Sequence, residues 1–89
     1  MKKFEKLLQK NGYLLDDGCY RKQFGPLLLE WWLGEFNMDD GKKVIIEVYE
    51  ITPNGNQPIF AQIFYRYDDM PIGKMELLFL EMFKVLKNE

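Results

Sequence analysis

The sequence predicts one α+β domain over residues 1–89: a helix, a four-stranded antiparallel meander and a second helix, with both helices packed on one face of the sheet. Apolar residues recur at helical spacing near both ends of the chain. Between these ends lie short runs rich in Val, Ile, Phe, Tyr and Trp, which favour pleated strands. Clusters of Gly, Asp, Asn and Pro separate the runs, as turns do.

The first predicted helix covers residues 2–11. Its apolar side chains share one narrow stripe, and Gly12 follows at a position where helices commonly end. The stripe consists of Phe4, Leu7 and Leu8. The remaining side chains are mainly Lys, Glu and Gln, so this helix is expected to lie on the sheet with one face in water.

Four strands are expected between the helices, over residues 19–24, 27–36, 44–51 and 58–67. The stretches DDGKK and PNGNQ are natural hairpin connections, so strands adjacent in sequence should pair in space. A short helix over residues 26–33 is the alternative to the second strand, because Pro26 suits a first helical position and Gly34 suits a helix end.

The second predicted helix covers residues 73–89, where the apolar period changes from two to about 3.6. Its expected buried face consists of Met75, Leu78, Phe79, Met82, Phe83, Val85 and Leu86. Leu77 and Leu80 fall on the opposite, charged side. Two helices about 10 Å wide can cover a four-stranded sheet about 19 Å wide on one face only, so the other face is expected to be open.

Two adjacent tryptophans are the most informative local feature. In a strand, Trp31 and Trp32 must point to opposite faces of the sheet. Trp31 alternates with leucines only and should face the helices, whereas Trp32 should be substantially exposed on the open face. The interaction site expected on that face consists of Trp32, Phe36, Tyr49, Phe60, Phe64 and Arg66. Glu30 and Glu47 are expected among these side chains.

The residue inventory excludes most familiar catalytic and metal-binding arrangements. The chain has no histidine, no serine and a single cysteine, Cys19. Catalytic triads and Cys-His pairs need an imidazole base, and structural zinc needs four Cys or His ligands. The three Asp-Asp pairs fit turns, because they do not fill the acidic positions of a calcium loop. We therefore expect no enzyme, cofactor or metal site; a carboxylate-based or Cys19-based enzyme is the catalytic alternative.

Charge and hydropathy limit the possible partners and the compartment. The net charge of −2 gives no field that would attract nucleic acid. Apolar runs are far shorter than the ~20 residues a bilayer requires, and polar residues interrupt the start of the chain where a signal peptide would be apolar. A lone cysteine fits a reducing compartment, so the sequence predicts a cytoplasmic protein without a membrane span.

The functional hypothesis follows from the uncovered aromatic face, because such faces are typical of protein interfaces. We expect a non-enzymatic protein–protein interaction module of adaptor or inhibitor type, such as phages and other mobile elements carry. Its partner would be a second copy, giving a homodimer, or an unidentified protein. The alternative is a single-stranded nucleic-acid-binding domain in which these aromatics stack bases and Arg21, Lys22 and Arg66 contact phosphates. A purely structural role for the aromatic side chains is the third alternative.

Overall fold

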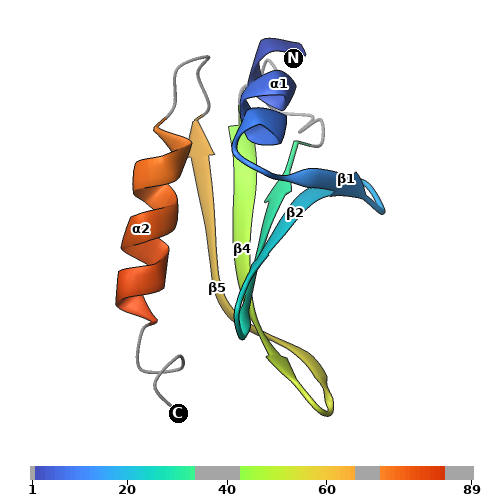
Figure 1. The fold of residues 1–89 in the computed structure, drawn as a ribbon, viewed down its shortest axis with the longest axis vertical. Helices are drawn as coiled ribbons and strands as arrows, with labels where there is room; N and C mark the ends of the chain where they lie inside the picture. Colours follow the sequence, from blue (N-terminus) through green and yellow to red (C-terminus); the bar gives the residue numbers. More distant parts are fainter. Residues whose placement is uncertain (1, 34–42, 66–70, 84–89) are drawn as a thin grey trace.

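The computed structural model describes residues 2–33, 43–65 and 71–83, and its elements run helix, five strands, helix (Figure 1). The elements are α1 (Lys2–Lys10), β1 (Leu14–Asp16), β2 (Cys19–Phe24), β3 (Leu27–Trp32), β4 (Lys43–Thr52), β5 (Gly55–Tyr65) and α2 (Ile72–Met82). All five strands form one antiparallel sheet in the order β1-β2-β3-β4-β5. The α+β class is confirmed, but the sheet has five strands instead of the predicted four.

The additional strand, β1, has only three residues and pairs with the start of β2. Three residues are too few to show the alternation of apolar and polar side chains that identifies a strand, so the sequence pattern could not reveal β1. The turn that follows is the informative signal. Asp17 and Gly18 both have positive φ, 53° and 85°, which matches the tight Asp-Gly hairpin turn. The Asp-Gly pair therefore closes a β1–β2 hairpin.

β3 is a strand, as predicted, because Leu27–Trp32 pairs with β2 on one side and β4 on the other. The alternative helix over residues 26–33 is wrong. The predicted continuation of this strand to residue 36 lies outside the described residues. Alternation along β3 places Trp31 in the core, where it is fully buried, and Trp32 on the opposite face, where it is half-buried.

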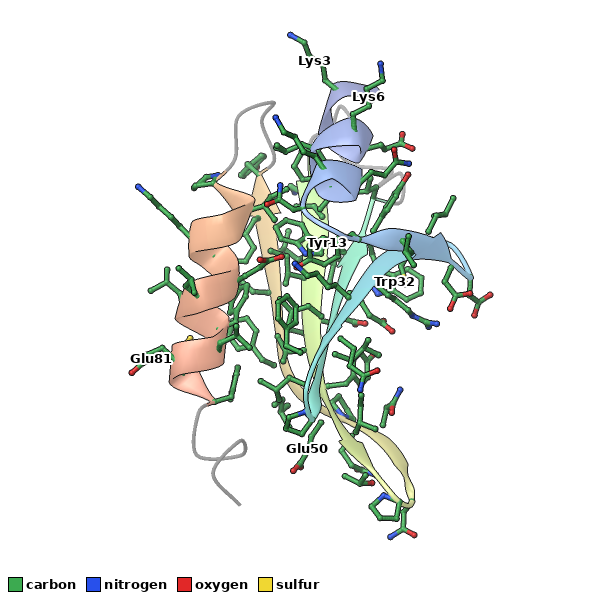
Figure 2. The ribbon with its side chains drawn as sticks, viewed as in Figure 1. Lys3, Lys6, Tyr13, Trp32, Glu50 and Glu81 are labelled. Carbon is green, nitrogen blue, oxygen red and sulfur yellow. The ribbon has the colours of Figure 1, made fainter. Side chains whose placement is uncertain are left out.

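The hydrophobic core lies between the helices and one face of the sheet, which we call the covered face. Trp31 is at its centre, with the rings of Phe4 from α1 and of Tyr13 each 6.0 Å away, centroid to centroid. Figure 2 shows Tyr13 between the helices and the sheet. Among the described residues, the core cluster consists of Phe4, Leu8, Tyr13, Tyr20, Leu27, Leu29, Trp31, Val44, Ile46, Val48, Ile72 and Phe79. The opposite side of the sheet is called the open face.

The two helices contact the covered face at separate places. α1 packs against Trp31 through Phe4, whereas α2 lies alongside the edge strand β5 and packs through Phe79, whose ring is 5.5 Å from that of Phe60 (Figure 1). The prediction that both helices pack on the same face of the sheet is therefore correct. The predicted helix packing differs in detail, because α2 lies at the margin of the sheet.

The predicted buried face of α2 is also wrong in part. Ile72, Glu76 and Phe79 are its buried residues, whereas Leu78 and Met82 are 63% and 57% exposed. Leu80, predicted outside, is half-buried, and Leu77 is exposed as expected; Val85 and Leu86 lie outside the described residues. Apolar side chains surround most of this helix, so its pattern defines no single face. The buried carboxylate of Glu76 forms an ion pair with Lys22, whose Nζ lies 3.5 Å from Glu76 Oε2.

Candidate functional site

The register of β4 and β5 moves two predicted site residues, Phe60 and Phe64, to the covered face. Val48 pairs with Phe60 and Val44 pairs with Phe64, and directly paired residues point to the same side of a sheet. Both valines are fully buried in the core. The predicted placement of Phe60 and Phe64 on the open face is therefore wrong. Side chains on the two faces of β5 are about equally apolar, so the sequence alone did not indicate which face of this strand points toward the core.

Two of the predicted site residues lie on the open face, and two cannot be placed. Trp32 and Tyr49 are on the open face, where both are half-buried. Phe36 and Arg66 lie outside the described residues. Trp32 is less exposed than predicted, because its ring lies near the β1–β2 turn (Figure 2), where a Cβ added to Gly18 would come within 4.0 Å of it.

Cross-strand pairing arranges the open face into three rows that run across the strands. The polar row consists of Arg21, Glu30 and Glu47. The apolar row consists of Trp32, Ile45 and Ile63. The third row consists of Gln23, Leu28 and Tyr49. A charged strip is thus placed between two strips that carry the apolar and aromatic side chains.

The polar row is held together by short hydrogen bonds. Arg21 Nε donates to Glu30 Oε2 at 2.8 Å, and Arg21 Nη1 donates to Asp16 Oδ2 at 2.8 Å. Trp32 Nε1 donates to Glu30 Oε1 at 3.0 Å. Both carboxylate oxygens of Glu30 therefore have donors, which explains how this side chain can be only 4% exposed on a face without a helix.

Glu30 and Glu47 are direct partners across β3 and β4, an arrangement that is unfavourable for two like charges unless each is bound separately. Glu47 Oε1 accepts a hydrogen bond of 2.8 Å from the Tyr49 hydroxyl. That bond, with burial and the nearby carboxylates, raises the pKa of Tyr49 to about 12. Tyr49 therefore remains a hydrogen-bond donor at neutral pH, and the two carboxylates have different donors.

Cys19 does not have the properties of a nucleophilic cysteine. Its side chain is 1% exposed, and Sγ lies 3.4 Å from the Asp16 carbonyl oxygen, to which the thiol donates. Burial, followed by the charge of Glu30, raises the pKa of the Cys19 thiol above its ordinary value. A reactive thiolate needs a lowered pKa and access to substrate, so this environment disfavours the Cys19-based alternative.

Exposed apolar side chains of the open face lie at both edges of the sheet. Leu14 of β1, which pairs with Arg21, is 74% exposed. Ile63 is 54% exposed and Tyr65 is 67% exposed, whereas Trp32 and Ile45 are half-buried. The Nζ atom of Lys43 lies 5.5 Å from the centre of the Tyr65 ring. At the other end of the sheet, a shallow hollow of about 400 Å³ is lined by Leu14, Leu15, Asp16, Arg21, Lys22, Gln23 and Leu28. The most accessible apolar side chains of this face therefore lie on the two edge strands, β1 and β5.

No relative identifies the chain by similarity. No known family model matches it, and neither curated proteins nor solved structures yielded a significant match. Within residues 2–33, 43–65 and 71–83, no three His, Cys, Asp or Glu side chains are grouped so that they could hold a metal ion. Neither α1 nor α2 has the length and apolar character needed to cross a bilayer.

Proposed function

We propose that this protein is a non-enzymatic protein–protein interaction module that binds through its open face. The observation that carries the proposal is the apolar row of Trp32, Ile45 and Ile63, which lies opposite the face that α1 and α2 contact. Its exposure is greatest at Ile63, next to the exposed ring of Tyr65. Aromatic and apolar side chains gathered in this way are those that dominate binding energy at protein interfaces.

The polar row would give such an interface its orientation. Hydrogen bonds already fix the side chains of Arg21, Glu30 and Trp32 in the free protein. Binding a partner would therefore cost little additional side-chain conformational entropy. In the described part of the open face, Asp16, Glu30 and Glu47 are accompanied by Arg21 and Lys43, so this surface has no positive excess that would attract phosphates. The same charges, and the location of Phe60 and Phe64 on the covered face, weigh against single-stranded nucleic acid as the partner.

The simplest partner is a second copy of the chain. In a two-fold dimer the open face would meet its own equivalent, so the apolar rows of the two copies would pack together. A stable interface requires ~800 Å² from each partner, about an eighth of the 6020 Å² accessible surface of this chain. The five strands span about 570 Å² of flat sheet, at ~3.3 Å per residue and ~4.8 Å between strands, so a dimer through this face would have a small interface.

Sedimentation equilibrium over a concentration series tests the proposal. The unmodified chain should show a monomer–dimer equilibrium, and Ile63→Lys should abolish it without lowering the melting temperature, because Ile63 is 54% exposed. Leu77→Lys is the matched control: Leu77 is 68% exposed on α2, away from the open face, so this variant should associate like the unmodified chain. A chain that stays monomeric throughout, or an Ile63→Lys variant that still dimerises, would contradict self-association through this face.

A further inference from the structure

The two edges of the sheet differ in how they are protected against pairing with another strand. β1 is three residues long and ends at Asp16, so this edge is short and acidic, as natural protected edges are. β5 is eleven residues long and pairs with β4; no other strand among the described residues pairs with it. Its sequence, GNQPIFAQIFY, contains no charged residue. β5 therefore lacks the charges that discourage edge pairing.

The hairpin end of β5 has two other protecting features. Pro58 cannot donate a backbone hydrogen bond, and the register shifts beside it, between Val48 and Tyr49 of β4. The last six residues of β5, 60–65, contain neither a proline nor a charge. Alternate residues of this stretch direct their backbone N–H and C=O groups to the outer edge, where no backbone hydrogen bond to another described residue is made.

The position of α2 restricts what can pair with that edge. α2 lies alongside β5 (Figure 1), and its exposed surface includes Leu77, Leu78 and Met82, which are 68%, 63% and 57% exposed. Two copies joined through β5 about a two-fold axis would keep their covered faces on the same side, so both α2 helices would compete for the space above the joined edges. An extended segment without a helix of its own would instead lie beside α2.

We propose that the outer edge of β5, over residues 60–65, binds an extended segment of another protein as a sixth, antiparallel strand. Backbone hydrogen bonds would supply the pairing. Alternate side chains of the segment would pack toward α2 or continue the open face next to Ile63 and Tyr65, so the segment should be rich in Val, Ile and aromatic residues and contain no proline in its paired part. The inference concerns protein binding, like the proposed function, but uses the edge and not the face of the sheet.

The probe is a synthetic peptide with the sequence of β4, residues 43–52, because this chain itself pairs that sequence antiparallel with β5. Hydrogen exchange measured by NMR on the intact protein should slow at backbone amides within residues 60–65 when the peptide is added. Exchange in α1 and β1 should remain unchanged. Unaltered exchange over residues 60–65 at about 1 mM peptide, where even a weak strand addition would be populated, would overturn the inference.

Two proline variants separate edge pairing from folding. Successive N–H groups of a strand point alternately toward and away from its neighbour, so of Ala61→Pro and Gln62→Pro only one removes a bond to β4. The variant that keeps its melting temperature should bind the peptide about tenfold more weakly, because it blocks the outer edge. Unchanged affinity in that variant would refute strand addition.

The outcomes also distinguish this inference from the proposed function. Dimerisation that is lost in Ile63→Lys, together with a peptide that leaves residues 60–65 unprotected, would support face-to-face association and refute edge pairing. Protection of residues 60–65 that grows with protein concentration in the absence of peptide would mean that a second copy occupies the edge, which contradicts the steric argument from α2. Peptide protection in a strictly monomeric protein would support edge pairing alone.

Discussion

Replacing Phe79 by alanine should destabilise the fold far more than replacing its neighbour Leu78. Both residues belong to the predicted buried face of α2, but only Phe79 is buried in the structure, at 5% exposure against 63% for Leu78. Phe79 also contacts the Phe60 ring at 5.5 Å. The two substitutions, one residue apart in the same helix, therefore test which side of α2 faces the sheet.

The expected difference between the two variants is a substantial fraction of the total stability. Phe→Ala substitutions in protein cores cost about 3–5 kcal/mol, and we expect about 3 kcal/mol for Phe79, because α2 lies at the margin of the sheet. Full burial of a leucine contributes roughly 1.5–3 kcal/mol, so Leu78, 63% exposed, should contribute about 0.5–1 kcal/mol. A chain of 89 residues is stable by about 4–13 kcal/mol in total.

Equilibrium unfolding in urea, followed by far-ultraviolet circular dichroism, measures both effects. The Phe79→Ala variant should unfold at a clearly lower urea concentration, with an unchanged dependence of free energy on urea, while Leu78→Ala should remain close to the unmodified chain. Alanine is a better helix former than either residue, so helix propensity cannot cause the loss. Equal costs, or a larger cost for Leu78, would show that α2 packs with a different face.

Three further predictions concern single side chains. Tyr13→Phe should change the free energy of unfolding by no more than about 1 kcal/mol, because the buried Tyr13 hydroxyl makes no well-formed hydrogen bond; a larger loss would show that its contact with Trp31 or Glu76 stabilises the fold. Glu47→Gln should lower the pKa of Tyr49 from about 12 toward the ordinary tyrosine value of 10.0, as followed by NMR titration of its ring. The pKa of Tyr49 is higher in the folded than in the unfolded chain, so the protonated Tyr49 hydroxyl stabilises the fold. This contribution should be present in full below pH 10.0 and disappear as the pH rises toward about 12. Cys19 should react with a thiol reagent only as fast as the protein opens, so rapid modification of the folded chain would contradict its burial.

The order of elements could be predicted from the sequence because it depends on local chemistry. Alternation around Trp31 and Trp32 identified β3 and its two faces, and Gly12 marked the end of α1. β1 could not be found from three residues, and the buried face of α2 could not be found because apolar side chains nearly surround the helix. These failures occur where the local pattern is either too short or nearly uniform.

The candidate site was harder to predict because it depends on register. Glu30 and Glu47 were expected on the open face, but their direct pairing, and the contact of Arg21 with Glu30, follow from the alignment of β2, β3 and β4. A shift of one residue in β5 would exchange its two faces, which is the error made for Phe60. No single-strand pattern contains that information, since both faces of β5 are apolar.

The agreement between strand order and chain order has a consequence for how the chain folds. Each strand of the sheet pairs with its neighbours in sequence. Pairing two such strands closes a comparatively short loop of chain, so the loss of chain entropy is small. The contacts of α1 with Trp31 and of α2 with Phe60 need a surface that exists only after the central strands have paired. Local ladders of this kind form faster than the distant pairings of a β-sandwich. Substitutions in β3 and β4 should therefore slow folding, whereas substitutions in α2 should chiefly accelerate unfolding.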